Sequence, residues 1–584
     1  MTDSSTPTIQ TNKRERLLIG FFLVAGLVVG LVQSVAWNSR VGWDTVSYLD
    51  LASAIRQGNF DLALSPYWSP LYPVTVAVAR TLSPALESER VVLCVLQYIF
   101  LMLFLGASYR FWSAVLKAQK HLRSMDHTHQ LAIIPQVAFM GSITLLACLT
   151  VGNVSVKGPD MLSAVIYLTA NALIVTCLYQ PPSVARAARI GCFMGLAYLA
   201  KAFFISWAVP CVALLAVFRK HYNLTVKHLL AMSIALLTTM ALYAVPLSIK
   251  LGYPTFGESG KYQVVFSSND RILPMVPMVH GSMETKHPSN IVFNNPTVYE
   301  FEKPFDVSYP PWFDPHYWND GLNAKIDWKL YNDLLVDKVV TLFLSFIVFI
   351  SVLKIGLCFS ARKLVPYSIP DLKTTSPIWL TACACSLLYL LMSAAVSRYF
   401  MGFIPTMVAG IFLAYQSPGS ELTIKRERRT LWFASVLILI SFVFNSLLHF
   451  YFFGVKITAP SSQAEDQHAT TAKKLTELGI KPHDKIMRIA RNEGGEYYWA
   501  HLADIRVVAE CVSPEEFFKM SPAKRSELDA LLRNKNIRAI VLDWSNRKPS
   551  DTGPEPAEPD WQLVPETKNY IRLIPQQPSG IRDN

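Results

Sequence analysis

The sequence is poor in charged residues, and this shortage excludes a wholly soluble protein. Only 16% of the 584 residues are Asp, Glu, Lys or Arg, whereas soluble globular domains carry about 25%. The charges are missing mainly from long apolar runs, many of them near the ~17–25 residues that a helix needs to cross a bilayer. The sequence therefore predicts an α-helical, polytopic membrane protein.

Disulfide frameworks, internal repeats and coiled-coil heptads are also missing from the sequence. Eight of the nine cysteines lie in or beside apolar runs, only Cys511 lies in a clearly polar region, and no zinc-ligand spacing is visible. The net charge is +12, but Lys and Arg lie in short clusters between the apolar runs. That pattern sets membrane orientation and does not form a basic nucleic-acid surface, so we expect no nucleic-acid partner.

About 11 apolar runs are candidates for transmembrane helices. The runs at 190–200 and 203–218 are short for full spans. They form either one broken pair that meets at the polar residue Lys201 or a buried helical hairpin. The runs lie at about 17–37, 88–112, 131–150, 160–180, 190–200, 203–218, 229–249, 336–358, 376–396, 402–416 and 431–453.

Clusters of Lys and Arg orient these runs. Six clusters fall on one face of the membrane, and such clusters mark the cytoplasmic side, so we expect a cytoplasmic N-terminus. The opposite face carries one glycosylation sequon, at Asn153, which favours a bacterial inner membrane over a eukaryotic one. The clusters lie at 13–16, 117–123, 186–189, 219–227, 362–373 and 425–429.

Three polar segments are expected on the periplasmic or extracellular side. Two are outer loops of a membrane domain that covers 1–455, at about 38–87 and 251–337. The third, 456–584, is expected to be a small soluble α/β domain. It shows helical spacing at 468–478 and 514–533, and strand patterns at 484–490, 537–542 and 570–574. Residues 497–510 indicate a helix followed by a strand; we interpret this domain as a packing module, with acceptor recognition as the alternative.

Asp44 is the first candidate for chemistry. It opens the segment WDTVSYLDLASAIRQGNF, residues 43–60, whose apolar spacing predicts an amphipathic helix on the membrane surface. A carboxylate at this boundary can accept a proton from a hydroxyl or an amine, or bind a metal ion. The alternative is that Asp44 only caps the helix.

Lys201 and Arg398 are cations between apolar runs, predicted at the outer membrane face. An isolated cation at that depth is unfavourable, so each should contact an anion or reach water. The alternatives are that Lys201 extends to lipid headgroups and that Arg398 pairs with a local carboxylate.

The second outer loop is rich in aromatic residues beside carboxylates over 280–321. Flat apolar rings and hydrogen-bond acceptors are what a sugar-binding site requires. The alternative is an aromatic loop that packs on the bilayer. The candidate sugar- or acceptor-binding residues are Trp312, Asp314, His316, Tyr317 and Trp318.

These features together resemble the GT-C glycosyltransferases, multi-span enzymes that use lipid-phosphate-linked sugars. The family includes the protein O-mannosyltransferases and the aminoarabinose transferases of lipid A. The resemblance starts with a first span, an acidic residue opening a surface helix, the G-x-F at 58–60 and the string SPYWSPLYP at 65–73. It covers roughly the first 420 residues. It implies a catalytic role for Asp44, the acidic residue of the first outer loop.

Three further strings are similar to family motifs. VSVKGPDM, 154–161, puts Asp160 where a second acidic residue is frequent. GLAYLAKAFF, 195–204, is similar to G-L-A-x-L-T-K-G and retains Lys201, although alanines replace the Thr and Gly on either side. SRYFMGFIP, 397–405, is similar to E-R-Y-x-x-P and retains Arg398, with Ser where an acidic residue is common. These departures put the flanks of both motifs in doubt.

The resemblance implies an inverting GT-C type glycosyltransferase that moves a hexosyl or pentosyl group from a polyprenyl-phosphate donor to an acceptor on the extracytoplasmic face. Asp44, assisted by Asp160, would be catalytic, and Lys201 with Arg398 would bind the donor phosphate. The acceptor, whether lipid, glycan or protein, is not determined. A divalent cation is the one candidate cofactor. His280, Glu284 and His287 are loosely spaced candidate ligands for it.

Two other functions belong to different classes. The first is a transporter or flippase of lipid-linked saccharides. Transporters usually carry internal repeats and midplane charges; the sequence shows no repeat, and its candidate charges lie at one face, which favours the enzyme. The second is a scaffold whose outer segments bind partners.

Overall fold

The structure is a computed structural model. It describes residues 13–36, 41–83, 88–125, 133–268, 285–301, 304–322, 375–392, 396–414, 428–443, 467–490, 497–543 and 559–575, with 328–329, 332, 425, 447 and 556 besides. The chain divides into two compact units. The first comprises 1–37, 94–243 and 332–451, and the second comprises 38–93, 244–331 and 452–584.

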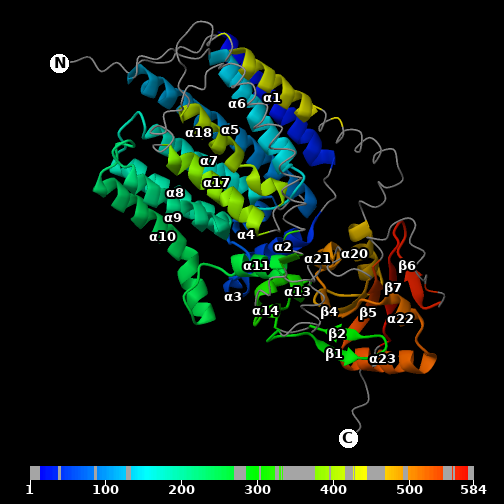
Figure 1. The fold of residues 1–584 in the computed structure, drawn as a ribbon. Coiled ribbons are helices and arrows are strands. Elements are labelled where there is room, and N and C mark those ends of the chain that lie inside the picture. The colour runs from blue at the N-terminus through cyan, green and yellow to red at the C-terminus, as the bar shows by residue number, and fades with distance from the viewer. Residues whose placement is uncertain are drawn as a thin grey trace. The chain divides into compact units, whose positions relative to one another are not determined.

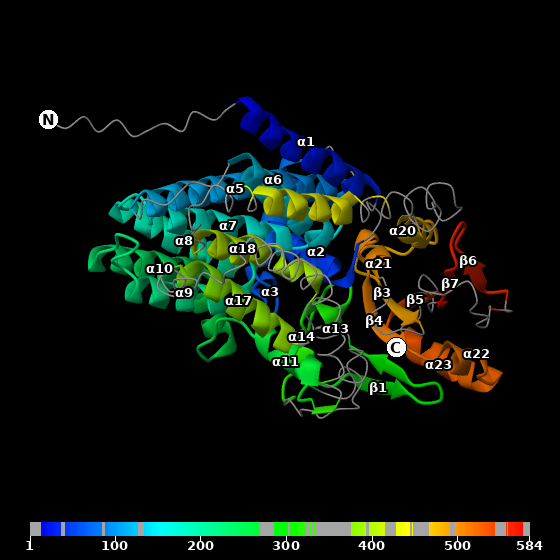
Figure 2. The same ribbon diagram turned by 45° about the horizontal axis from the view of Figure 1, so that its top comes forward.

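The first unit is helical. Its long helices run in similar directions, and α17 lies against α18 in both views (Figures 1 and 2). The boundary between the units falls within α5 and within α10. The helices are α1 (Lys13–Ala36), α5 (Glu89–Met125), α6 (Ile133–Leu145), the π-helical η1 (Leu146–Gly152), α7 (Asp160–Thr176), α8 (Val184–Ala200), η2 (Ala202–Phe204), α9 (Ile205–Val217), α10 (Val226–Leu251), α17 (Ser376–Leu391), η3 (Ser397–Phe400) and α18 (Phe403–Ala414).

Four described helices are long and apolar enough to cross a membrane: Lys13–Val35, Glu89–Leu122, Ile133–Gly152 and Val226–Leu251. Helix α1 exposes an apolar stripe that includes Leu17, 65% exposed, and Val24, 60% exposed. Such a stripe suits lipid and not water. The prediction of an integral membrane protein is confirmed, whereas the number of about 11 spans stays a prediction. The run at 336–358 lies outside the described residues.

Helices in this unit approach closely where small residues allow it. At Gly191 of α8, an added Cβ would lie 1.9 Å from the carbonyl oxygen of Met232 in α10. Buried polar side chains bond to buried backbone groups: Gln33 Nε2 donates to the Leu149 carbonyl oxygen at 2.8 Å. Such bonds are needed because no water is present in the hydrocarbon core.

The helix is interrupted at Lys201, where the sequence predicted that two short apolar runs could meet. Lys201 has an extended backbone, with φ −156° and ψ 114°, and stands between α8 and the short η2. Helices α8 and α9 are therefore separate and meet at this residue. The break places a charged side chain at a helix end, where it can leave the apolar interior.

The second unit contains a seven-stranded mixed sheet with the order β1-β2-β4-β3-β5-β7-β6. Strands β4, β3 and β5 are parallel, and the pairs toward both edges are antiparallel. The strands are β1 (Asn290–Phe293), β2 (Val298–Glu300), β3 (Lys485–Ile489), β4 (Arg506–Cys511), β5 (Ile537–Leu542), β6 (Trp561–Leu563) and β7 (Tyr570–Leu573).

The expected α/β character of the tail is confirmed. Helices α20 (Gln467–Glu477), α21 (Tyr498–Leu502), α22 (Pro514–Phe518) and α23 (Pro522–Asn534) fall where the sequence patterns placed helices. The strands from the second outer loop were not foreseen. Tyr299 of β2 pairs with Glu510 of β4, and Phe293 and Val298 join the apolar core of the tail. One sheet therefore includes two segments that the sequence analysis treated separately.

A fully buried ion cluster lies in the parallel part of this sheet. Arg488 of β3 contacts Glu510 of β4 at 2.6 Å and Asp543, just after β5, at 3.1 Å. Tyr309 Oη donates to the second oxygen of Glu510 at 3.1 Å. Both carboxylates therefore share one cation, and each buried charge has a hydrogen-bonded partner, as burial requires.

The expectation that the segment 43–60 forms an amphipathic helix on the membrane surface is wrong. Helix α2 (Trp43–Arg56) is buried continuously from Thr45 to Ala52 and again at Ala54. It packs against α4 (Leu71–Leu82), α13 (Pro310–Phe313) and α21, and also contacts α3 (Phe60–Ala63). The helix is buried because the second loop and the tail cover its polar side as well, which the spacing of its own residues does not reveal.

His501 of α21 connects these segments through charge. Its Nδ1 lies 2.6 Å from Asp50 Oδ1 in α2, and its Nε2 lies 3.0 Å from Glu89 Oε2 at the start of α5. Ser308 of the second loop donates to Asp50 at 2.8 Å. Burial lowers the pKa of His501, but the charge of Glu89 and hydrogen bonds to Asp50 and Glu89 outweigh it and raise the pKa to about 10.

This histidine should make stability depend on pH. Because the folded pKa lies above the ordinary 6.5, its contribution is fully present below pH 6.5 and is lost as pH rises through about 10. His501→Asn should lower the melting temperature of the full-length protein in detergent at pH 7, and should flatten the decline of that temperature between pH 7 and 10.

His483→Asn is the matched control, because the His483 side chain is 54% exposed and lies 3.6 Å or more from its carboxylates. Its profile should parallel that of the wild type. Equal slopes for wild type and His501→Asn would contradict the role assigned to His501.

Candidate functional site

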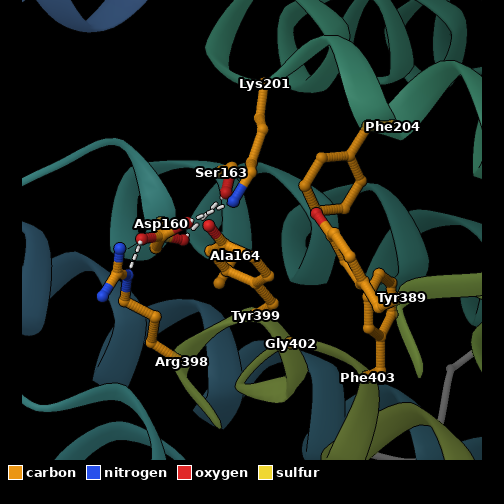
Figure 3. A pocket seen from close by; sticks show the side chains of 10 residues that line it. All are labelled: Asp160, Ser163, Ala164, Lys201, Phe204, Tyr389, Arg398, Tyr399, Gly402 and Phe403. Atoms are coloured by element: carbon orange, nitrogen blue, oxygen red, sulfur yellow. Dashed lines mark hydrogen bonds and ion pairs between the residues drawn. The ribbon is translucent and has the colours of Figure 1, made fainter. Parts of the chain in front are cut away.

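Asp160, Lys201 and Arg398 come together in the first unit, each from a helix end. Asp160 is the first residue of α7, Lys201 follows the last residue of α8, and Arg398 lies in η3 before α18. Figure 3 shows the two cationic side chains directed at the carboxylate from different helices. The carboxylate therefore joins positions 41 and 238 residues apart in the sequence.

The carboxylate is shared between the two cations. Lys201 Nζ lies 2.6 Å from Asp160 Oδ1, and Arg398 Nε lies 2.7 Å from Asp160 Oδ2. The Asp160 side chain is 11% exposed, whereas Lys201 and Arg398 are 21% and 23% exposed. The three side chains sum to one net positive charge, and both cations remain partly accessible.

Aromatic rings form the wall beside the cations. Lys201 Nζ lies 3.3 Å from the centroid of the Tyr399 ring, within the range of a cation–π contact. Tyr389 stacks on Phe203 with 3.5 Å between centroids. The pocket at this position is lined by Asp160, Ser163, Ala164, Lys201, Phe204, Tyr389, Arg398, Tyr399, Gly402 and Phe403 (Figure 3).

Local backbone geometry directs the side chains. The extended conformation at Lys201 ends α8, and the Lys201 carbonyl oxygen accepts a hydrogen bond from Phe204 N at 2.9 Å to start the next turn. Gly402 leaves room beside the pocket, since an added Cβ would lie 3.1 Å from Tyr167 Cδ1. Tyr167 Oη is itself fixed by Thr406 Oγ1 at 2.9 Å.

This arrangement can bind an anion. Two cations on rigid helix ends present donors toward one pocket, and the local carboxylate holds them in place without cancelling both charges. Pairing with a carboxylate was the alternative for Arg398, and the structure shows that pair. Lys201 shares the same partner. A catalytic role for Asp160 stays a prediction, and its observed contacts are those of a residue that positions the two cations.

Asp44 lies in the second unit, in the first turn of α2. The N-cap residue is Gly42, with no side-chain capping bond, so Asp44 is not the cap that the alternative supposed. Trp312 Nε1 donates to Asp44 Oδ1 at 3.2 Å. One of the five candidate residues of the second loop, Trp312, is thus hydrogen-bonded to the carboxylate of the first loop, Asp44.

Asp314 and Trp318 form hydrogen bonds that stabilise the local fold of the second loop. Asp314 precedes α14 (Pro315–Trp318) and accepts hydrogen bonds from the backbone N–H groups of His316 at 3.0 Å and Tyr317 at 3.2 Å. Burial raises the pKa of Asp314. Trp318 is buried, and its Nε1 donates to the Pro310 carbonyl oxygen at 3.0 Å. A sugar-binding role for these two residues stays a prediction.

His316 and Tyr317 are more accessible. His316 Nε2 lies 3.3 Å from Tyr253 Oη, and Tyr317 stacks on His287 with 4.1 Å between centroids. His287 Nε2 also lies 3.6 Å from Asp320. These contacts give the second loop a polar aromatic surface at the positions where the sequence predicted sugar binding.

The part of the chain that the structure describes contains no ligand set for the predicted divalent cation. Within it, no group of three or more His, Cys, Asp or Glu side chains could hold a metal ion. His280 and Glu284 lie outside the described residues. We therefore derive no step that passes through a metal.

The pocket also contains residues that the sequence did not single out. Tyr399 follows Arg398 in the SRYF string, so its position was available from the motif. Tyr389 lies in an apolar helix and gave no signal, because only packing brings α17 against the η2 turn. Phe203, on which Tyr389 stacks, lies in the motif in which the sequence singled out Lys201 alone.

Comparisons with known proteins find similarity at the level of overall fold. No protein-family model matches the chain, and no curated protein matches it in sequence. Solved structures that are similar include ArnT from Cupriavidus metallidurans bound to undecaprenyl phosphate, with 13% identity, a TM-score of 0.40, and 95% of this chain and 97% of that chain covered.

The oligosaccharyltransferase of Archaeoglobus fulgidus is also similar. Its form tethered to an acceptor peptide shares 13% identity with a TM-score of 0.40 and covers 89% of this chain and 69% of that chain. The likeness assigns no substrate or residue role to this chain.

Removing the shared carboxylate should destabilise the first unit. Asp160→Asn leaves two like charges side by side, and loss of one partner from a buried ion pair costs about 3 kcal/mol. The melting temperature of the purified protein in detergent should therefore fall by several degrees.

Asp61→Asn is the control for this change. Asp61 is 87% exposed and 3.7 Å from Lys250, and exposed pairs contribute about 0–1 kcal/mol. A melting temperature for Asp160→Asn equal to that of the control would contradict the proposed importance of the shared carboxylate.

Proposed function

We propose that this protein is a membrane glycosyltransferase that moves a sugar from a polyprenyl-phosphate donor to an acceptor hydroxyl or amine. The observation that carries the proposal is the pair of cations, Lys201 and Arg398, held by one carboxylate in an aromatic pocket of a helical membrane unit. A lipid phosphate is the anion that a membrane offers at such a site.

The phosphate is the leaving group in this reaction. When the bond between the anomeric carbon and the phosphate oxygen breaks, negative charge develops on that oxygen. Lys201 and Arg398 stabilise this charge, and fixed donors at the leaving group lower the barrier because they need no reorganisation. Asp160 keeps both cations in place before the donor binds and reorients as the phosphate takes its share of their charge.

Asp44 supplies the second role. Its carboxylate accepts the proton of the acceptor O–H or N–H while the acceptor heteroatom forms a bond to the anomeric carbon. One displacement of this kind inverts the configuration of that carbon. The products are the glycosylated acceptor and polyprenyl phosphate. The transferred group is a hexose or a pentose, and the acceptor is a lipid, a glycan or a protein.

The reaction takes place on the extracytoplasmic side in this proposal. The Lys and Arg clusters favour a cytoplasmic N-terminus, and they favour the periplasmic or extracellular side of a bacterial inner membrane for the two outer loops and the tail. Polar aromatic residues of the second loop, His316 and Tyr317 among them, are candidates for contact with the sugar or the acceptor.

Transfer of radiolabel tests this function. Membranes that contain the wild-type protein are given undecaprenyl-phosphate hexoses and pentoses carrying label in the sugar, and the label is followed into lipid, polysaccharide and protein fractions. Asp44→Asn should reduce kcat by about 100-fold or more. Lys201→Gln should reduce kcat/KM by about 10-fold or more because it removes a charged donor.

Lys250→Gln is a matched control for Lys201→Gln. Lys250 also forms an ion pair, but with the exposed Asp61, and its loss should change transfer less than twofold. If a correctly folded wild-type protein moves no label from any donor, the enzyme proposal fails. Uptake of lipid-linked sugar into sealed vesicles without covalent transfer would instead establish a flippase.

A further inference from the structure

The Asp44 carboxylate has a neutral donor fixed beside it. Trp312 Nε1 lies 3.2 Å from Asp44 Oδ1, within the range of a hydrogen bond. The two residues are 268 positions apart, so the contact exists only because the second loop folds against α2. A carboxylate at a helix N-terminus does not need an indole partner for stability.

The Trp312 side chain is held by three aromatic rings of the first loop. The centroids of Trp43, Trp68 and Tyr67 lie 6.4, 5.8 and 6.1 Å from that of Trp312. All three pairs are edge-to-face or tilted, the geometry that aromatic pairs favour. The indole therefore has little freedom to turn away from Asp44.

The backbone around Trp312 is fixed as well. Ser47 Oγ donates to the Trp312 carbonyl oxygen at 3.1 Å. Trp68 Nε1 donates to the carbonyl oxygen of the next residue, Phe313, at 2.9 Å. Both donors come from the first outer loop, which also carries Asp44, so the indole and the carboxylate are positioned by the same loop.

We propose that Trp312 is a positioning residue that holds the Asp44 carboxylate in the orientation needed to accept the acceptor's proton. This inference rests on the proposed function and replaces, for Trp312, the sugar-stacking role that the sequence predicted. A hydrogen bond to one carboxylate oxygen restricts rotation of the carboxylate group. Preorganisation of this kind raises kcat without tightening substrate binding.

Trp312→Phe removes the N–H donor and keeps a ring in the aromatic cluster. In the labelled undecaprenyl-phosphate sugar assay, kcat should fall about 10-fold, the effect expected from one hydrogen bond to a charged group, while KM for the donor changes less than twofold. A rise in KM with unchanged kcat would overturn the inference in favour of sugar binding.

Trp112→Phe is the matched control. It also removes one buried indole N–H donor, but that donor bonds to Thr144 Oγ1 at 3.1 Å in the first unit and not to Asp44 or its aromatic neighbours. Its kcat should stay within twofold of wild type. Equal losses of kcat in the two variants would show a general packing effect and would overturn the positioning role.

A measurement without substrate separates this inference from the proposed function. A water-soluble carbodiimide activates protonated carboxyl groups, and added glycine ethyl ester then forms an amide that mass spectrometry locates on the peptide containing Asp44. Buried Tyr497, whose pKa is raised by burial and by the charges of Asp50 and Asp44, stays neutral throughout and adds no charge.

The donor favours the ionised carboxylate, so labelling of Asp44 at pH 6 should be about 10-fold faster in Trp312→Phe than in wild type or Trp112→Phe. Equal labelling in all three proteins overturns the inference even if transfer is observed. Conversely, faster labelling in Trp312→Phe without transfer by the wild type would leave the contact established and the glycosyltransferase proposal refuted.

Discussion

Charge that is removed from water must be compensated nearby, and this constraint organises the first unit around the Asp160 carboxylate. Without it, Lys201 and Arg398 would be two like charges at neighbouring helix ends in a largely apolar bundle. With it, the start of α7, the residue after α8 and the residues of η3 are held together by ion pairs. The result is a stable cluster that still carries one net positive charge. A surplus of that sign, next to a pocket, is the property that an anion-binding site needs.

The same constraint appears twice in the second unit. His501 lies between Asp50 and Glu89, and Arg488 lies between Glu510 and Asp543. Each cluster joins segments that are distant in sequence. A buried charge needs an opposite charge beside it, and the fold can supply that charge from any part of the chain. The Arg488 cluster stabilises the parallel centre of the sheet. The His501 cluster fixes α2, the helix that carries Asp44, to the tail.

The tail therefore has a clear structural relation to the chemistry proposed for the first loop. It covers α2 through α21, and its sheet includes β1 and β2 of the second loop. The second loop in turn presents Trp312 to Asp44. A domain without a catalytic motif of its own can thus affect the orientation of the carboxylate that is proposed as the base. The role of the tail as a packing module stays a prediction.

The local sequence determined the kind of protein and the secondary structure of its parts. Apolar runs marked the membrane helices, because the bilayer tolerates only continuous hydrogen-bonded backbone. Alternation and helical spacing marked the elements of the tail, since both depend on neighbouring residues alone. The motifs also selected Asp160, Lys201 and Arg398, which the structure brings together, although the resemblance assigned Asp160 to catalysis and the two cations to the donor phosphate.

Tertiary structure decided what these residues contact. Asp160 is the shared partner of two cations, Asp44 is bonded by Trp312, and α2 is buried where its own spacing suggested a membrane surface. Each of these facts depends on contacts between residues more than 40 positions apart. Periodicity and motif spacing describe one segment at a time. Which distant segment covers it, and with which side chain, is fixed only when packing and charge compensation act on the whole chain.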